Sequence, residues 1–448
     1  MQPGCDLRLL YSAGMVIHSQ LPPRSILPMT APRSRPGLTL LAAFLGWMFD
    51  GMEMGIFPLV AGPALRQMGG HTGIIAGSPA AAAFVQNWMG IITAFFLLGA
   101  AAGGLVFGWL GDRVGRVKAM TWSILFYSGF TGLCYFAKDP VQLAGLRFLA
   151  ALGMGGEWSL GVALVMECWP EKRRPILAGA IGASANLGYA VIAIIALQWK
   201  ITDNSWRWVM LVGALPAALT FLIRLFIPES ERWIASVKKG ASSPLHEIFS
   251  PQYRRRTFLG IAFASVALLV SWGIVQWIPL WADQMVKATG KTDDTLKAKI
   301  QLCSASGAVL GSLLAPIVGG ILGRRITYFL LCLTSLGACE WLFLGVHQFD
   351  WLFMLVTAVV GCFTASFYGW LPLYLPELFP TRARATGQGL SFNFGRIIAA
   401  AGVWQMATLM GFFGGSYPKA GATIALIYLL GMALIWLAPE TKGRPLPE

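Results

Sequence analysis

Charged residues are scarce in this chain: Asp, Glu, Lys and Arg make up only 12% of its 448 residues. Soluble domains carry about 25% charged residues, because their surfaces face water. A chain with half that content cannot cover a water-facing surface of its size. The 56% hydrophobic content also excludes intrinsic disorder, so the composition predicts a protein embedded in a membrane.

Residues that commonly hold metals or act as nucleophiles are also few. The four histidines all lie in predicted tails or loops, so no buried histidine cluster is expected. The seven cysteines show no CxxC spacing and lie mostly in apolar stretches, which is typical of small packing residues. Walker, HExxH and GxSxG motifs are missing from the sequence. We therefore expect no enzyme, no metal site and no cofactor.

Long apolar runs are abundant instead. After residue 37, stretches long enough to cross a hydrocarbon layer of about 30 Å recur twelve times. Their continuous hydrophobicity favours helices over barrel strands, because a helix satisfies its own backbone hydrogen bonds in lipid. The predicted spans are 38–62, 86–110, 117–137, 141–166, 177–198, 206–227, 257–286, 301–322, 325–346, 351–373, 386–411 and 419–438.

These runs and the polar segments between them divide the chain into five parts. The predicted parts are a disordered N-terminal tail at 1–37, a six-helix bundle at 38–227, a central loop at 228–256, a second six-helix bundle at 257–438 and a C-terminal tail at 439–448. The first tail is rich in proline and arginine and lacks the apolar core of a secretory signal, and Met29 within it is an alternative start.

Lys and Arg are shared unevenly between the two sides of the predicted membrane. With both termini in the cytoplasm, the cytoplasmic segments hold more than twice as many Lys and Arg as the outer loops. This is the side on which such residues accumulate. The net charge of +14 is therefore assigned to topology and not to a nucleic-acid partner. The short loops favour a bacterial inner membrane, and we expect a monomer in the bilayer.

Three charged motifs recur at an offset of about 210 residues. The repeated pairs are Gly115-Arg116 with Gly323-Arg324, Glu167 and Arg174 with Glu377 and Arg384, and Pro228-Glu229 with Pro439-Glu440. A softer echo relates residues 186–189 (NLGY) to residues 393–396 (NFGR). The repeats predict a duplicated six-helix unit, and two related bundles around a site are typical of an alternating-access carrier.

The motifs themselves carry a family resemblance. Residues 108–116 (GWLGDRVGR) resemble the loop 2–3 signature of the major facilitator superfamily. Residues 228–233 (PESERW) and 439–444 (PETKGR) resemble the ends of spans 6 and 12 in its sugar-porter-like clan, and residues 376–387 resemble the loop 10–11 signature. The resemblance covers nearly the whole chain. It implies a twelve-helix transporter of small molecules.

Two further segments narrow the resemblance. Residues 153–158 (GMGGEW) and 393–396 (NFGR) are most similar to the sialate and lactate (metabolite):proton symporter branch. Residues 271–277 (SWGIVQW) stand where hexose porters carry a Gln-Gln…Gly-x-Asn pattern, and the His- and Asp-containing motif of fungal monocarboxylate carriers is missing there too. The exact substrate therefore stays open.

Charged residues at the cytoplasmic helix ends are expected to form a latch, whose ion pairs lock the two bundles and break as the bundles rock. The expected pairs include Glu167 with Arg173 or Arg174, and Glu377 with Arg382 or Arg384. The alternative is that these cations only anchor topology. The predicted latch residues are Gly108, Asp112, Arg113, Gly115, Arg116, Glu167, Arg174, Glu229, Arg232, Arg324, Glu377, Arg384 and Glu440.

Acidic side chains inside the spans require an explanation, because a charge at mid-bilayer costs at least about 2.5–3.5 kcal/mol. Asp50 and Glu53 have i, i+3 spacing and lie on one helix face. Since two close carboxylates repel and burial disfavours their charge, we expect this pair to take part in proton coupling. A pairing with a neighbouring cation is the alternative. Glu157 has the same two readings.

Basic side chains inside the spans point to an anion. Arg396 with Asn393 is the best candidate for binding a substrate carboxylate, because a guanidinium stays protonated and binds carboxylates in a fork. The alternative is that Arg396 balances a buried acid, and both roles can alternate. The other predicted substrate-binding residues are Arg147, Gln276, Asn186, Tyr189 and Tyr368. Each polar one, alone, is more commonly a helix–helix contact.

The sequence thus predicts a secondary active transporter that carries a small organic anion, a monocarboxylate or a sialic-acid-like acid, in symport with protons. A sugar, an aromatic acid or a cationic drug-like substrate on the same fold is the alternative, as is a nutrient sensor that no longer transports. The acids Asp50, Glu53 and Glu157 would suit a cation, whereas Arg396 suits an anion.

Overall fold

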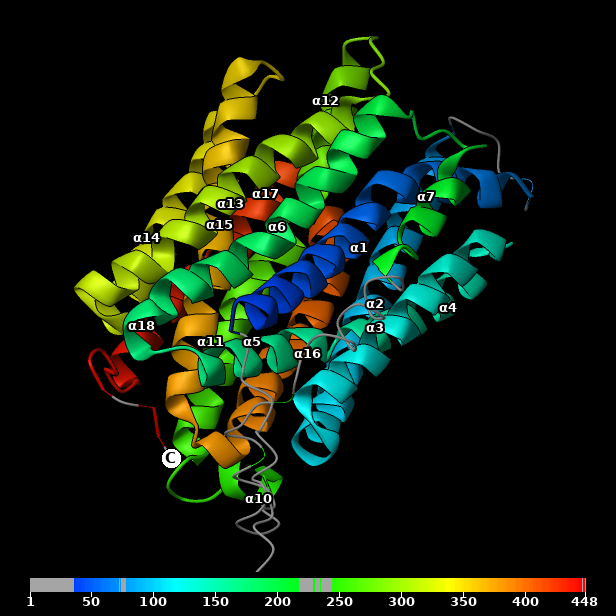
Figure 1. The fold of residues 1–448 in the computed structure, drawn as a ribbon. Helices are drawn as coiled ribbons and strands as arrows, with labels where there is room; N and C mark the ends of the chain where they lie inside the picture. Colours follow the sequence, from blue (N-terminus) through cyan, green and yellow to red (C-terminus); the bar gives the residue numbers. More distant parts are fainter. Residues whose placement is uncertain are drawn as a thin grey trace, which may run out of the picture. The chain divides into compact units, whose positions relative to one another are not determined.

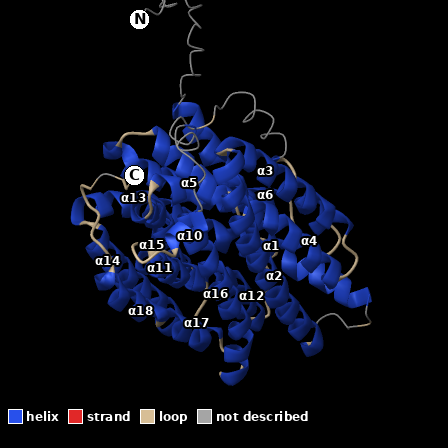
Figure 2. Cartoon of the chain, turned by 90° about the horizontal axis from the view of Figure 1, so that it is seen from below, coloured by secondary structure: helices blue, strands red, loops and turns tan. Residues whose placement is uncertain are grey.

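The computed structural model describes residues 36–71, 73, 78–216, 229, 234, 244–444 and 446–447. Regular structure in these ranges is entirely helical (Figures 1 and 2), which confirms the predicted all-α fold. The predicted N-terminal tail lies outside the described residues except for its last two positions, which already belong to the first helix. Most of the predicted central loop also lies outside them.

The first half of the chain forms seven described α-helices. They are α1 (Pro36–His71), α2 (Pro79–Val114), α3 (Arg116–Leu133), α4 (Pro140–Met154), α5 (Glu157–Cys168), α6 (Arg174–Gln198) and α7 (Trp206–Val212). Short 3₁₀ turns follow α3 at Cys134–Phe136 and precede α6 at Glu171–Arg173. Proline begins several of these helices, because the first helical position needs no backbone N–H.

The second half begins with the short helix α10. Its elements are α10 (Pro244–Ile248), α11 (Arg254–Gly273), α12 (Ile278–Ala288), α13 (Leu296–Leu322), α14 (Arg324–Glu340), α15 (Trp351–Leu378), α16 (Arg384–Phe412), α17 (Tyr417–Ala425) and α18 (Ile427–Leu434). Single turns at Val275–Trp277, Trp341–Gly345, Thr381–Ala383 and Ile435–Leu437 extend or connect them. Figure 1 shows α14 and α18 on one side of the bundle and α3 and α4 on the other.

Nine helical segments among the described residues are long and apolar enough to cross a membrane. Two further predicted spans form helices, α3 and α16, whose sequences are more polar. The sixth predicted span begins as α7, and its remainder at 217–227 lies outside the described residues. Eleven of the twelve predicted spans therefore match a helix or a pair of helices in position. For the sixth span, only its start is described.

Three predicted spans are divided, and the one at 419–438 separates at Leu426 into α17 and α18. The span expected at 257–286 divides into α11 and α12, because Pro279 lacks the N–H that would continue the helix and its ring crowds the carbonyl four residues earlier. The span expected at 141–166 divides into α4 and α5 at Gly155 and Gly156. A Cβ on Gly155 would collide with the backbone of Ala100 in α2, so this break brings two helices into close contact.

The two halves meet along helices rich in small residues. The main contacts between halves join α6 to α13 and α2 to α16. Gly182 of α6 lies so close to the Tyr368 carbonyl that any Cβ there would collide with it, and Gly179 packs against Leu313. Small residues allow such close approach in a membrane, where helix association depends on packing.

The predicted repeat recurs in the geometry of one end of the bundle, here called the motif end. Gly115 and Gly323 have φ of 115° and 94°, which favours glycine. The arginine after each one donates from Nη1 to the carbonyl five residues earlier, at 2.8 Å for Arg116 and 3.0 Å for Arg324. Equivalent residues thus repeat the same local structure in both halves.

Two glutamates complete this repeated geometry. Glu229 accepts backbone N–H groups from Val117 and Lys118, both at 3.1 Å. Glu440 accepts those of Arg324 and Arg325 at 3.0 and 3.1 Å. A carboxylate at a helix N-terminus satisfies free N–H groups and complements the helix dipole. The two glutamates therefore cap α3 and α14 in the same way.

Candidate functional site

A central cavity of about 920 Å³ lies between the two halves. Its walls come from α1 and α6 of the first half and from α11, α12, α13, α15 and α16 of the second. Its polar lining includes Asn186, Tyr189, Gln276, Gln301, Tyr368 and Arg396. Its large aromatic lining includes Trp47, Trp272 and Phe392. An apolar and aromatic lining with a few polar groups is typical of small-molecule sites.

Arg396 brings a cation to the cavity wall. Its Nη1 donates to Asn393 Oδ1 at 2.8 Å and to the Gly155 carbonyl at 3.4 Å, and its guanidinium lies 4.9 Å from the Phe392 ring centre. Both hydrogen bonds of this side chain within the described part use Nη1. An arginine carries five N–H donors, so Nη2 and Nε keep donors for a ligand.

Asn393 has a different position from the one predicted. It does not line the cavity and is buried, where its Nδ2 donates to the Gly389 carbonyl at 2.7 Å. Its Oδ1 holds Arg396. A Cβ on Gly104 of α2 would collide with this amide, so a residue of the other half restricts its position. Asn393 therefore positions Arg396 and does not contact the cavity.

The uncharged polar residues link the halves around the cavity. Gln276 Nε2 donates to the Tyr189 hydroxyl at 2.8 Å, and Asn186 Nδ2 donates to Ser312 Oγ at 3.1 Å. These two residues, with Tyr189 and Tyr368, line the cavity. Gln276, Tyr189 and Asn186 also form hydrogen bonds between helices of the two halves, which is the alternative role considered for them.

Gln301 is a cavity residue that sequence reasoning missed. Its Nε2 donates to the carbonyls of Tyr189 at 3.2 Å and Gly55 at 3.3 Å, so it joins α13 to α6 and α1. The predicted span starts at residue 301, so Gln301 is its first residue and borders the polar segment before it. In the structure α13 begins at Leu296, and Gln301 lies in its second turn.

Arg147 does not reach the cavity. Its Nη1 pairs with Glu53 Oε1, and both side chains are only 1% exposed. The rings of Phe57 and Phe96 lie at 5.2 and 4.5 Å from the guanidinium. The two residues thus form a buried ion pair inside the first half, which is the pairing with a neighbouring cation that was the alternative for Glu53.

Asp50 faces Glu157 of α5 instead of pairing with Glu53 as the spacing predicted. The two carboxyl groups are close enough to interact, and Arg396 acts electrostatically on Asp50. Glu157 Oε2 lies against α1, where a Cβ on Gly46 would be 3.3 Å away. The i, i+3 rule gives the shared face of α1, but it does not give the neighbouring helix that each side chain meets.

This carboxyl pair is buried and incompletely hydrogen-bonded. Both oxygens of Glu157 and Oδ1 of Asp50 have no hydrogen-bond partner among the described residues. Two facing carboxylates repel when both are ionised, whereas one proton between them provides the missing donor. The arrangement can therefore hold a proton. It lies behind the cavity wall, because neither residue lines the cavity.

The motif end contains the ion pairs of the predicted latch, with other partners. Arg116 Nη2 lies 3.6 Å from Glu167 Oε1, and Arg324 Nη2 lies 2.5 Å from Glu377 Oε1. Each pair joins helices of one half, and in each the glutamate meets the arginine of the repeated Gly-Arg motif. Across the halves, Arg174 acts electrostatically on Glu377.

The remaining latch residues are placed as follows. A Cβ on Gly108 would lie at ordinary contact distance from Ser159 and Ala385, and Arg113 stacks on Trp109 at 4.4 Å. Arg384 donates from Nε to the Pro376 carbonyl at 3.2 Å. Arg232 and the side chains of Asp112 and Arg382 lie outside the described structure.

Membrane-spanning helices, duplicated about a cavity with one cation in its wall, define a transporter of small molecules. The sequence matches the Major Facilitator Superfamily over residues 39–403, and the protein therefore belongs to this family. This confirms the family expected from the motifs. The protein is an integral, multi-pass membrane protein and, as a member of a transporter family, is not an enzyme.

Known relatives transport metabolites. The chain is 32% identical to the inner membrane metabolite transport protein YgcS of Escherichia coli strain K12 over 390 residues, covering 80% of this chain and 84% of that protein. It is 25% identical to the sialic acid transporter NanX of the same strain over 394 residues, covering 87% and 91%.

Among solved structures, the fold is similar to that of the proton:xylose symporter XylE bound to 6-bromo-6-deoxy-D-glucose. The TM-score is 0.72, with 92% of this chain and 97% of that chain covered. At 15% sequence identity this likeness concerns the fold alone.

Proposed function

We propose that the protein is a proton-coupled symporter that carries a small organic acid by alternating access. One observation carries the choice of cargo. Among the described residues, Arg396 is the only charged side chain that lines the central cavity. A buried cation attracts a carboxylate and repels a cationic substrate, and an uncharged sugar does not require it. The similarity to a sialic acid transporter supports an acidic cargo.

The rest of the lining suits an acid with an unsaturated or otherwise flat body. Trp47, Trp272 and Phe392 supply aromatic walls, and Gln276 and Gln301 supply amides that can orient polar substituents. Aromatic side chains bury large areas and favour stacked or edge-on partners. A single carboxylate on Arg396 with a compact body against these rings fits the charge and size of the cavity.

Proton coupling follows from the position of Asp50 between Glu157 and Arg396. Arg396 stabilises the ionised form of Asp50. When a substrate carboxylate binds Arg396, it competes for that positive charge, and a proton on the Asp50–Glu157 pair then replaces it. Such coupling is reciprocal, so protonation of the pair also favours substrate binding. Substrate and proton are then carried together, and neither Arg396 nor the carboxyl pair is left with an uncompensated charge.

The loops at the motif end carry most of the loop Lys and Arg. Because such residues accumulate on the cytoplasmic side, this distribution supports a bacterial inner-membrane location with both termini in the cytoplasm. In that orientation the motif end faces the cytoplasm. The alternating motion would then separate the contact between Gln388 Nε2 and the Ser159 carbonyl, now at 2.8 Å, which joins the halves on that side.

The test uses purified protein in liposomes with an inward proton gradient. Uptake is followed for labelled lactate, sialic acid, benzoate, glucose and tetraethylammonium, with protein-free liposomes as control. We expect at least one acid to accumulate, and a protonophore to abolish that accumulation. Uptake of glucose or the amine alone would contradict the assignment of Arg396, and equilibration of an acid without regard to the gradient would contradict proton coupling.

A further inference from the structure

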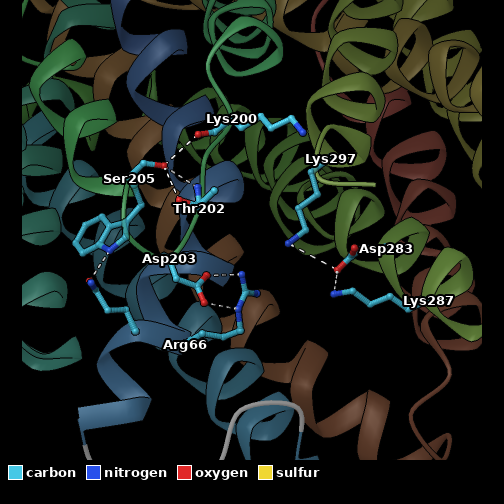
Figure 3. Close-up of polar contacts among 10 residues, drawn as sticks. Arg66, Lys200, Thr202, Asp203, Ser205, Asp283, Lys287 and Lys297 are labelled. Atoms are coloured by element: carbon cyan, nitrogen blue, oxygen red, sulfur yellow. Dashed lines mark hydrogen bonds and ion pairs between the residues drawn. The ribbon is translucent and has the colours of Figure 1, made fainter. Parts of the chain in front are cut away.

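A second cavity of about 660 Å³ opens at the end opposite the motif end, here called the far end. It lies between α1, α12, α13 and the loop before α13. Its charged lining is Arg66, Asp283, Lys287, Asp293, Asp294 and Lys297. Figure 3 shows Arg66, Asp283, Lys287 and Lys297 of this set. The proposed transport site does not use these groups. Their pairing pattern shows which charge is available to a ligand.

The acidic groups of this cavity are already engaged. Arg66 forms a fork with Asp203, with Nη2 to Oδ1 at 2.6 Å and Nε to Oδ2 at 3.3 Å. Lys287 donates to Asp283 Oδ2 at 2.8 Å. Asp293 accepts from Lys299 Nζ at 2.8 Å, and this contact outside the membrane lowers the pKa of Asp293 to about 2. Asp294 lies 3.9 Å from Lys200 Nζ, so each of these carboxylates has a cationic neighbour.

Lys297 is the exception. Its side chain is 17% exposed, and its Nζ lies 3.8 Å from Asp283 Oδ2, which is beyond hydrogen-bond distance. Its ammonium donates no hydrogen bond to the described residues, although a lysine has three donors. Figure 3 shows this ammonium directed toward Asp283, the carboxylate it shares with Lys287. The lining as a whole holds three acids and three cations, but Lys297 shares its one neighbouring carboxylate with Lys287, so its positive charge is only partly offset where it lies.

A second cation from the other half approaches Lys297. A Cβ on Gly62 of α1 would lie 3.0 Å from Lys297 Nζ and 3.2 Å from Arg66 Nη1. The two cations thus converge on the same point of α1 although they belong to different halves. Close like charges raise the local positive potential, and a partly buried cavity weakens solvent screening.

The far-end cavity lies next to the central cavity along α12 and α13. Gln301 and Lys297 of α13 are four residues apart on one face, as are Pro279 and Asp283 of α12. Each step is one helical turn, about 5.4 Å. Gln301, bonded to Gly55 and Tyr189, stands at the boundary between the two spaces.

We propose that the far-end cavity is a second anion-binding site, in which Lys297 beside Arg66 holds the carboxylate of an organic acid one turn away from the central site. The choice of a carboxylate rests on the proposed function. The site is weaker than the central one, because its cations are partly exposed and already share acids. The far-end site raises the local concentration of the acid where the halves meet, and the acid moves from there to Arg396 in the central site.

The test measures binding of 3-fluorobenzoate to the full chain in nanodiscs by ¹⁹F NMR, at low and high salt. Arg396→Gln removes the cation of the central site. We expect a weak binding class to remain in this variant, and to weaken at least about tenfold when Lys297→Gln is added or when salt is raised. Lys297→Arg should retain it. Lys419→Gln, an exposed lysine outside both cavities, makes the same charge change and should have little effect.

The outcomes separate this proposal from the proposed function. If Arg396→Gln abolishes all binding, or if Lys297→Gln changes nothing in that background, the second site is refuted while the role of Arg396 stands. If Lys419→Gln weakens binding as much as Lys297→Gln, the effect is general electrostatics and the site is refuted. If binding depends on Lys297 but not on Arg396, the second site stands and the proposed central site fails.

Discussion

Helices α6 and α16 occupy equivalent places in the two halves and differ in one decisive residue. Each carries the echoed segment, NLGY at 186–189 and NFGR at 393–396. The glycine packs the helix onto the first helix of its own half: Gly188 against Met48 and Gly395 against Ala264. The fourth residue of both segments, Tyr189 or Arg396, lines the central cavity. The repeat therefore preserves packing and changes the charge at the cavity.

The same division extends to the buried charges near the cavity. The acids Asp50, Glu53 and Glu157, with the Arg147 that pairs with Glu53, belong to the first half, whereas the cavity cation belongs to the second. The two groups meet at the break between α4 and α5, where the Gly155 carbonyl accepts Arg396. One half thus holds the groups suited to protons, and the other the group suited to the substrate. Each prediction below tests that division.

The largest expected effect is on the stability of the first half. Glu53→Gln leaves the buried Arg147 without its counter-ion, and breaking such a pair typically costs about 3–5 kcal/mol of unfolding free energy. Unfolding of the purified protein in mixed micelles measures it. Asp50→Asn is the matched control, because it removes a repulsion with Glu157 and should be neutral or stabilising.

A double-mutant cycle sharpens this comparison. Adding Arg147→Gln to Glu53→Gln removes the uncompensated charge, so the double variant should be more stable than Glu53→Gln alone. If Glu53→Gln and Asp50→Asn lower stability equally, the two acids have the same environment and the pairing described here is wrong.

The next largest effect concerns transport. Arg396→Gln should lower uptake of the transported acid by at least about 30-fold, since loss of a buried charged partner costs about 2–5 kcal/mol. Tyr189→Phe changes the equivalent residue of the other half and removes one neutral hydrogen bond, worth about 0.5–1.5 kcal/mol. Its uptake should fall less than about tenfold. Equal losses in the two variants would show that the asymmetry of charge has no bearing on binding.

The sequence predicts the scaffold better than the pairings. Apolar runs locate the helices because lipid exposure is a property of composition, and Arg396, Gln276 and Tyr189 are found because polar residues in such runs are rare. The pairs Glu53–Arg147 and Asp50–Glu157 could not be predicted, since they depend on the rotation of α1 against α4 and α5. The division of the span at 257–286 could have been predicted from Pro279, but hydropathy does not register the effect of a proline on a helix.

Proton coupling should respond more moderately. Asp50→Asn and Glu157→Gln keep the shape of the pair but remove an ionisable group. We expect concentrative uptake driven by a proton gradient to fall about 5- to 150-fold, the range of typical coupling free energies. Exchange of labelled for unlabelled acid at equal pH should change much less, because it needs no net proton movement. Loss of exchange in both variants would instead place these acids in substrate binding.

The smallest effect belongs to Asp293 at the far end, and it tests where the pH dependence of transport arises. Hydrogen bonds from Lys299 and Thr295 lower the pKa of Asp293 from its usual 3.8 to about 2. Its folded pKa is depressed, so its contribution to loop stability is present above pH 3.8 and is lost as pH falls toward 2. With its side chain 35% exposed, that contribution is small.

Asp293 therefore stays ionised throughout the range from pH 5 to pH 8. In proteoliposomes, Asp293→Asn should leave the shape of the uptake–pH profile unchanged in that range, whatever it does to the rate. Asp50→Asn should flatten the same profile. A profile whose shape depends on Asp293 would move proton sensing to the far end and overturn its assignment to the first half.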